Sequence, residues 1–175
     1  MKRHLIIIII ICLLAPVCSS AETTSVTSIS KIDVCFSPGG NCTRVIIKEL
    51  DAARSEILVQ AYSFTSTPIA AAIVRAHKRG VLVKVILDKS QDREGYSSIT
   101  FLKNAGIPTF VDSAHAIAHN KVFIIDVEVV ITGSFNFTKA AEEKNAENLL
   151  IIRSKDLSKI YKDNWRLHHE HSEVN

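Results

Sequence analysis

Apolar runs rich in β-branched residues recur along the chain and predict strands separated by helices. The run at 81–87 is continuously apolar, as in strands that are buried on both faces of a sheet. Apolar residues at helical spacing fill the intervals, and Pro68 and Gly80 mark the start and the end of one helix. In order, the expected elements are strand 32–36, helix 43–54, strand 57–62, helix 68–79, strand 81–87, helix 97–105 and strand 107–111.

The remainder of the chain follows the same scheme after a polar, charged loop at 88–95. Trp165 has apolar neighbours at four-residue spacing on the last helix, which predicts that it packs in the core. Because strands and helices alternate, we expect an α/β domain with a mixed, largely parallel β-sheet flanked by helices on both faces. The later elements are strands 122–125, 128–132 and 148–152, a helical turn at 138–144 and a final helix at 156–168.

Residues 1–21 have the pattern of a secretory signal peptide, with Lys2 and Arg3 before an apolar run and small residues up to Ala21. We expect cleavage after Ala21. An uncleaved membrane anchor is the alternative, but the apolar run is shorter than the roughly twenty residues of a spanning helix. The sequence therefore predicts export to the periplasm or the medium, a flexible Ser/Thr-rich leader at 22–30 and a single domain at 31–175.

Charge and cysteine content change once the signal is removed. The number of Lys and Arg residues falls from 21 to 19 against 18 acidic residues, so the formal net charge falls from +3 to +1 and gives little indication of nucleic-acid binding. Cys35 and Cys42 remain, on either side of a Pro-Gly-Gly turn. In an exported protein a disulfide is favoured over two free thiols.

The residues with the clearest chemistry lie at two adjoining strands. His119 and Lys121 are two residues apart, so strand alternation places both on one face. Ser134 and Asn136 are also two apart, and Gly133 before them permits a close backbone approach. An ammonium, a hydroxyl and an amide beside a histidine suit a tetrahedral oxyanion, with phosphate as the natural ligand.

The spacing from His119 to Asn136 is H-x-K-x4-D-x6-G-S-x-N, which resembles the signature of the phospholipase D superfamily at every defined position. Asp126, the motif aspartate, should face away from His119 and Lys121 and is interpreted as a turn residue or a brace. Segments 61–65, 76–81, 106–108, 133–140 and 145–148 are similar to the small secreted bacterial endonucleases of that superfamily, which have one motif per chain.

The resemblance implies a phospholipase D-like fold and a mechanism without a metal or another cofactor. His119 would attack phosphorus to form a phosphohistidine, with Lys121, Ser134 and Asn136 binding the phosphate. Glu147 would hydrogen-bond to His119 and orient it. Because a second imidazole must protonate the leaving oxygen, single-motif members imply a homodimer in which each chain supplies one His119.

The substrate is less constrained by the sequence. A sequence-nonspecific endonuclease cutting DNA, with RNA as an open alternative, fits a site that contacts phosphate and not bases. A phospholipase D acting on membrane phospholipid headgroups is the second hypothesis. A nucleic-acid-binding protein that takes part in DNA uptake is the third.

The other histidines are interpreted as solvated residues. His168, His169 and His171 lie near the end of the final helix, and His115 lies in the loop before the motif. Solvated histidines are common at such positions, so we expect no metal site.

Overall fold

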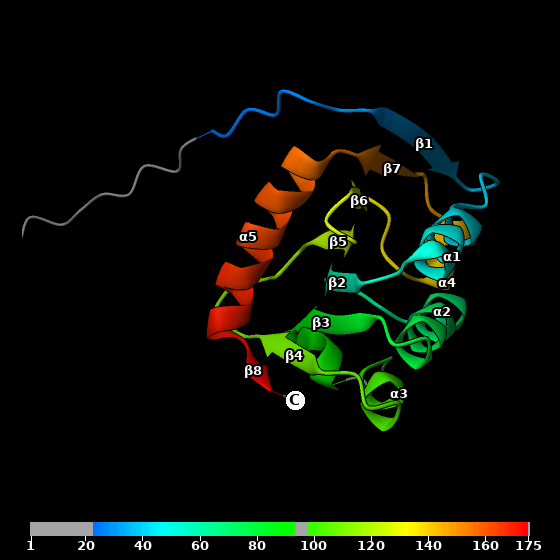
Figure 1. Ribbon diagram of the computed structural model, residues 1–175. Helices are drawn as coiled ribbons and strands as arrows, with labels where there is room; N and C mark the ends of the chain where they lie inside the picture. The colour runs from blue at the N-terminus through cyan, green and yellow to red at the C-terminus, as the bar shows by residue number, and fades with distance from the viewer. Residues whose placement is uncertain (1–22, 94–97, 175) are drawn as a thin grey trace, which may run out of the picture.

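The computed structural model describes residues 23–93 and 98–174 (Figure 1). Its centre is an eight-stranded sheet in the order β1-β7-β6-β5-β2-β3-β4-β8. The strands correspond to those predicted from the sequence, apart from the short terminal β8, which has too few residues to give a pattern. They are β1 (Lys31–Ser37), β2 (Glu56–Ala61), β3 (Leu82–Asp88), β4 (Thr109–Asp112), β5 (Lys121–Ile125), β6 (Val129–Gly133), β7 (Glu147–Arg153) and β8 (Glu173–Val174).

The sheet is mixed, as expected, but the expected predominance of parallel strands is wrong. Only β2, β3 and β4 pair in parallel among the described strands, and the other pairings are antiparallel. Parallel neighbours need a long crossover, and helices supply one between β2 and β3 and between β3 and β4. In contrast, β5 and β6 are joined by a tight turn at Asp126 and Val127, both with positive φ, which reverses the chain at once.

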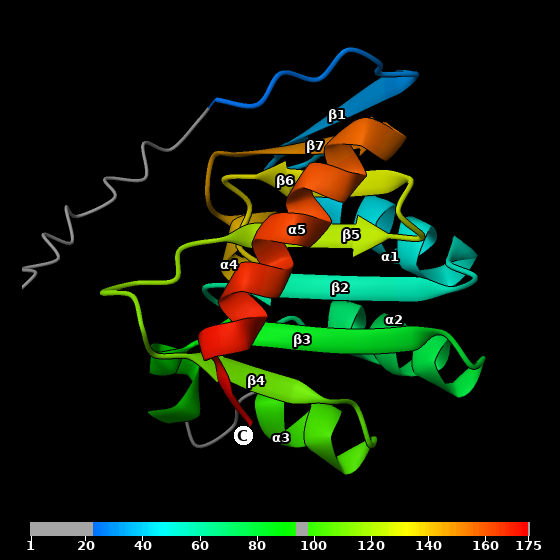
Figure 2. The same ribbon diagram turned by 60° about the vertical axis from the view of Figure 1, so that its left-hand side comes forward.

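Helices cover both faces of the sheet, as the sequence predicts (Figures 1 and 2). On one face lie α1 (Cys42–Ala52), α2 (Thr67–Lys78), α3 (Ser98–Asn104) and α4 (Lys139–Glu143). On the other face α5 (Lys155–His171) crosses the strands, as Figure 2 shows. A short 3₁₀ turn, η1 (Lys89–Arg93), follows β3 where the sequence predicts a polar loop.

The core has two parts, one on each side of the sheet. The larger part joins the sheet to α1 and α2, whose Ile46, Leu50 and Ile73 are fully buried. The smaller part lies under α5, where Trp165 is 3% exposed and its Nε1 donates to the carbonyl oxygen of Val59 at 2.9 Å. The prediction that Trp165 is a core residue is confirmed. Together the two layers hold the strands rigidly and therefore fix the positions of the groups at their ends.

The N-terminal features are described in part. Cys35 and Cys42 form the expected disulfide, which ties the end of β1 to the start of α1. The predicted signal at 1–21 lies outside the described residues. In the leader, the backbone N–H of Ser30 donates to the carbonyl oxygen of Arg153, which continues the pairing of β1 with β7. Among the described residues, every helix is too short or too polar to cross a membrane.

Candidate active site

The motif residues meet at one edge of the sheet. The carboxyl ends of β2 and β6 and the amino ends of β5 and β7 lie at this edge, because Ala61 pairs with Lys121 and Gly133 with Leu149. The edge therefore brings together residues that are as far apart in sequence as Tyr62 and Glu147. The largely buried strands β2, β5, β6 and β7 hold these residues in position.

His119 and Lys121 stand side by side but in different surroundings. His119 is exposed just before β5, whereas Lys121, the first residue of β5, is only 6% exposed. The ammonium of Lys121 donates to the carbonyl oxygen of His119 at 2.9 Å. Burial lowers the pKa of Lys121 below the ordinary 10.5, and the negative charge of Glu147 opposes this in part. A partly desolvated ammonium attracts a phosphate more strongly than a solvated one does.

Tyr62 forms an aromatic wall behind both residues. Its ring centroid is 4.5 Å from that of His119, and the Lys121 ammonium lies 5.1 Å from the Tyr62 centroid, within cation–π range. The Tyr62 N–H donates to the carbonyl oxygen of Asn120 at 2.8 Å, so the wall is fixed to the segment that carries the histidine. Sequence reasoning gave Tyr62 no role, although its place directly after a buried strand is a usable signal.

Glu147 is bound to Ser134 and not to His119. The Ser134 hydroxyl donates to Glu147 Oε2 at 2.6 Å, and the Asn145 side-chain amide donates to Oε1 at 3.0 Å. Within the described part of one chain, the hydrogen bond to His119 that the resemblance implies is therefore not formed. The Ser134 hydroxyl also accepts from the N–H of Asn148 at 3.1 Å, which fixes its orientation.

Gly133 and Asn136 fit the expected geometry of the second strand. A Cβ at Gly133 would overlap the carbonyl oxygen of Asn148, so the close backbone approach predicted from the sequence is confirmed. That same oxygen accepts from the N–H groups of Ser134 and Phe135. Asn136 is partly buried, and its Oδ1 has no hydrogen-bond partner among the described residues. The amide thus remains free to take part in a larger assembly of groups.

Asp126 is a brace, as predicted. Asp126 lies at the opposite end of β5 from Lys121. The Asp126 carboxylate accepts from the backbone N–H groups of Arg54, Ser55 and Glu56 at 2.8–2.9 Å and from the Ser55 hydroxyl at 2.7 Å. Burial alone would raise the pKa of Asp126, but these hydrogen bonds outweigh it and hold the pKa below 3.8. The motif aspartate therefore fixes the start of β2 to the β5–β6 turn.

Asp88 holds the segment that leads to His119. This residue is 2% exposed, and its carboxylate accepts from the N–H of Ala118 at 2.7 Å and from that of Ser90 at 2.9 Å. Burial would raise its pKa, but the hydrogen bonds lower it below 3.8, so the group is ionised. Sequence reasoning missed Asp88 because it was assigned to a surface loop.

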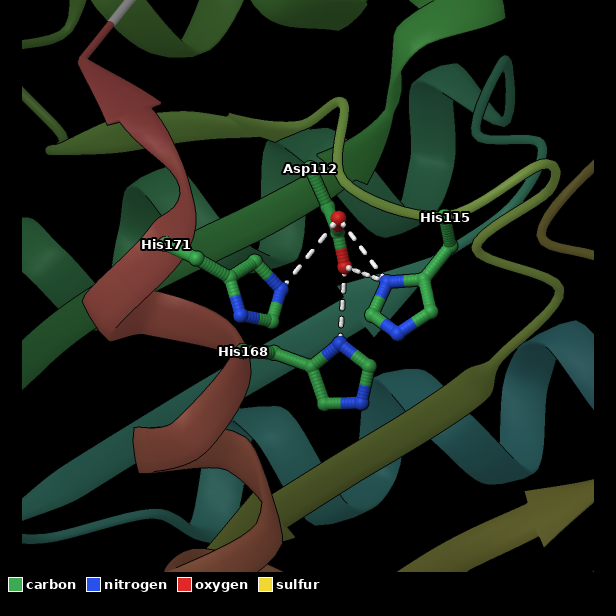
Figure 3. A group of neighbouring side chains, drawn as sticks. All are labelled: Asp112, His115, His168 and His171. Carbon is green, nitrogen blue, oxygen red and sulfur yellow. Dashed lines mark hydrogen bonds and ion pairs between the residues drawn. The ribbon is translucent and has the colours of Figure 1, made fainter. Parts of the chain in front are cut away.

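A second cluster lies further along the same edge. His115 and His171 are exposed, as the sequence predicts, but the histidines are not separate residues. His115, His168 and His171 surround the buried carboxylate of Asp112 (Figure 3). Burial would raise the pKa of Asp112, but hydrogen bonds from the three imidazoles lower it to about 2. His169 points elsewhere and packs against the rings of Phe110 and Trp165. Among the described residues, Asp112, His115, His168 and His171 form the group that could hold a metal ion.

Comparison with known proteins matches residues 46–166 to a family described as cardiolipin synthase, PLD-like domain. A Rickettsia bellii protein named phospholipase D is 44% identical over 136 residues, 78% of this chain and 68% of the relative. Mouse mitochondrial cardiolipin hydrolase is 34% identical over 116 residues, 66% of this chain and 52% of that protein. The crystal structure of Nuc from Salmonella typhimurium, a phospholipase D family member, superimposes with a TM-score of 0.78 at 38% identity, covering 83% of this chain and 97% of Nuc.

A mixed sheet in an α/β fold, with one H-x-K motif at its edge next to a Gly-Ser-x-Asn segment at the end of β6, defines the phospholipase D fold class. The chain belongs to the PLD-like family, in its single-domain branch. It is a phosphodiesterase of that superfamily.

Proposed function

We propose that the protein is an exported, sequence-nonspecific endonuclease that hydrolyses DNA, and RNA as a second substrate, without a metal ion in the chemical step. The observation that carries the proposal is the pairing of an exposed His119 ring with the buried ammonium of Lys121. An accessible imidazole can reach a phosphodiester that lies in a bulky polymer. The neighbouring ammonium binds the negative charge that the attack increases.

The reaction has two steps that balance. A ring nitrogen of His119 attacks phosphorus, the bond from phosphorus to the leaving oxygen breaks, and a second imidazole gives that oxygen a proton. The second imidazole, now neutral, takes a proton from water, which displaces His119 from phosphorus. Lys121 and Asn136 bind the phosphoryl oxygens in both steps. Ser134 joins them when its hydroxyl proton, which it donates to Glu147 in the described chain, turns to the phosphate.

The second imidazole comes from a second copy of the chain. Attack and departure occur on opposite sides of phosphorus, so one His119 cannot serve both roles in the same step. The exposure of His119 and the unpartnered Oδ1 of Asn136 support a site completed across a twofold axis. In this assembly Glu147 accepts the Ser134 hydroxyl within its own chain.

The substrate assignment follows the similarity to the small secreted endonucleases of the superfamily and the close superposition on Nuc over nearly all of that chain. Hydrolysis of phospholipid headgroups is the second candidate, because relatives are named phospholipase D and cardiolipin hydrolase. Ile117, which is 56% exposed two residues before His119, would suit a lipid surface. Export is supported by the predicted signal and by the disulfide between Cys35 and Cys42, a bond that persists in oxidising compartments.

One experiment separates these functions. The purified protein is incubated in EDTA with plasmid DNA, single-stranded DNA, RNA and liposomes of phosphatidylcholine or cardiolipin. His119→Ala is the inactive variant, and His77→Ala, a change on α2 away from the motif, is the matched control. We expect nucleic-acid cleavage that is lost in His119→Ala and kept in His77→Ala. Lipid turnover without DNA cleavage would instead establish the phospholipase function.

A further inference from the structure

Three imidazole nitrogens converge on one carboxylate where the end of α5 meets the end of β4 (Figure 3). His168 Nδ1 lies 2.7 Å and His171 Nε2 lies 3.4 Å from oxygens of Asp112, and His115 Nδ1 lies 3.1 Å from both oxygens. One ligand atom from each of the four residues lies within 4.8 Å of the others. We propose that Asp112, His115, His168 and His171 bind one zinc ion.

The distances from the Asp112 carboxylate to the three rings are close to those between the ligands of a tetrahedral zinc ion. Ligand atoms about 2.0–2.1 Å from zinc are about 3.4 Å apart at tetrahedral angles. The oxygen–nitrogen distances of 2.7–3.4 Å therefore lie within about 1 Å of that spacing. The four ligand atoms lie within 4.8 Å of one another, so side-chain rotation has to shorten the longest separation by up to about 1.4 Å. Figure 3 shows that each ring already directs a nitrogen toward the carboxylate.

Ion pairing alone explains the cluster less well. The Asp112 side chain is fully buried and carries one negative charge, which one imidazolium would balance. Yet the three ring centroids are 4.8, 5.2 and 5.3 Å apart, so protonation of all three rings would bring like charges together. A divalent cation binds neutral imidazoles and an ionised carboxylate at once, and so accounts for the whole group.

The ligand types select the metal. Three nitrogens and one carboxylate oxygen suit zinc and its spectroscopic substitute cobalt, whereas magnesium and calcium prefer six or more oxygens. Four protein ligands complete the tetrahedron, which is typical of a structural site and leaves no position for a reactive water. The side chains of His115 and His171 are 46% and 37% exposed, so the ion can enter from solvent.

The position of the site indicates what zinc would do. His168 and His171 come from the last turn of α5, and Asp112 and His115 from the end of β4 and the loop that leads to His119. The Lys89 ammonium donates to the carbonyl oxygen of His115 at 2.9 Å and so already holds this loop from the other side. Zinc would fasten the end of the chain to the segment that carries the catalytic histidine, and would raise stability by binding only the folded state.

The test measures metal binding and stability, not turnover. The untagged full-length protein is treated with EDTA, desalted and titrated with Zn²⁺ by calorimetry and with Co²⁺ by visible absorption. We expect one ion per chain and the intense bands of tetrahedral Co²⁺. At a free zinc concentration about 100-fold above Kd, Tm should rise by roughly 5–10 °C.

Three variants make the result specific. His168→Gln and His171→Gln should each weaken zinc binding about tenfold or more and abolish most of the Tm rise, while His77→Gln should bind as the unchanged protein does. If His168→Gln fails to fold, His171→Gln, at an exposed ring, decides. A folded protein that binds no Zn²⁺, or binds it equally well in His171→Gln, would overturn the site. Because the four ligands lie outside the motif, that outcome would leave the proposed nuclease function unaffected.

Discussion

His119 and Lys121 are neighbours that the chain treats in opposite ways. The imidazole is exposed and can reach a polymer, while the ammonium is buried against Tyr62 and the backbone of His119 itself. Nucleophilic attack requires access, whereas charge stabilisation is strongest where water is excluded. Strand alternation places both residues on one face but does not orient their side chains. The Tyr62 ring, which contacts both of them, supplies that orientation.

Replacement of Tyr62 tests this orienting role. In Tyr62→Ala the ring that lies 4.5 Å from His119 is lost, and the histidine can adopt other rotamers. We expect kcat/KM on DNA to fall roughly tenfold to a hundredfold with little change in stability. Tyr62→Phe keeps the ring and should keep most of the activity. An equal loss in both variants would show that the hydroxyl and not the ring is what matters.

The buried ammonium predicts how activity changes at alkaline pH. Because burial lowers the pKa of Lys121 below 10.5, its positive charge is present at neutral pH and disappears, as pH rises, earlier than that of an ordinary lysine. In a plot of kcat/KM against pH, the midpoint of the alkaline decrease should therefore lie below pH 10.5. Lys121→Arg stays charged and should move this midpoint to higher pH at a lower maximal rate. If the midpoint does not move while circular dichroism shows a folded protein, another group controls it.

At the scale of elements, the β5–β6 hairpin connects the site to the rest of the sheet. Its turn places Asp126 and Val127 at positive φ, and the Asp126 carboxylate collects the N–H groups at the start of β2. The two ends of β5 thus have separate roles: Lys121 is placed at one end to bind phosphate in the proposed reaction, and Asp126 fixes the strand at the other end. This division explains why an aspartate five residues beyond the lysine belongs to the motif without touching phosphate.

Asp126→Asn should therefore act on stability first. Loss of charged acceptors for several N–H groups should lower the free energy of unfolding by about 2 kcal/mol at pH 7. Because the folded pKa of Asp126 is lowered, its contribution is present above pH 3.8 and is lost as pH falls through the lowered pKa. The difference in free energy of unfolding between wild type and Asp126→Asn, measured by denaturant unfolding, should then become smaller only below pH 3.8.

Glu128→Gln is the matched control on the same hairpin. Glu128 pairs at 3.2 Å with Lys155 at an exposed position, so its loss should change the free energy of unfolding by less than about 1 kcal/mol. An equal effect of both substitutions would contradict the bracing role of Asp126.

The sequence pattern predicted most strands and helices, because the spacing of apolar residues within each segment reflects which of its sides faces the core. It also located Gly133 and the Asp126 brace, since strand alternation determines which side a residue faces. It could not predict that most strand pairs are antiparallel, because strand order depends on contacts between distant segments. The same limit hid the cluster around Asp112, because the strands β5, β6 and β7 and the helix α4 lie between His115 and the helix that carries His168.

At the scale of the whole molecule, one edge of the sheet carries both the motif residues and the Asp112 cluster. The described part of the chain offers one His119 to a reaction that needs two imidazoles, so the proposed site forms only when two such edges face each other. Each dimer then has one composite site, and a dimer with a single His119 is inactive. This requirement distinguishes the dimer from a self-sufficient monomer by a simple mixing experiment.

Wild-type protein and His119→Ala are mixed and unfolded under conditions that keep the Cys35–Cys42 disulfide intact. The mixture is then refolded at a fixed total protein concentration. With random pairing, the fraction of dimers that carry two His119 residues is the square of the fraction of wild-type chains. An equal mixture should therefore have about a quarter of the full activity. Independent monomers would give about half, because each active chain would work alone. The control is a mixture with His77→Ala, which should stay fully active at every ratio because each copy keeps His119. A linear response to the fraction of His119→Ala, together with a monomeric mass in light scattering, would exclude the shared site and require a second proton donor within one chain.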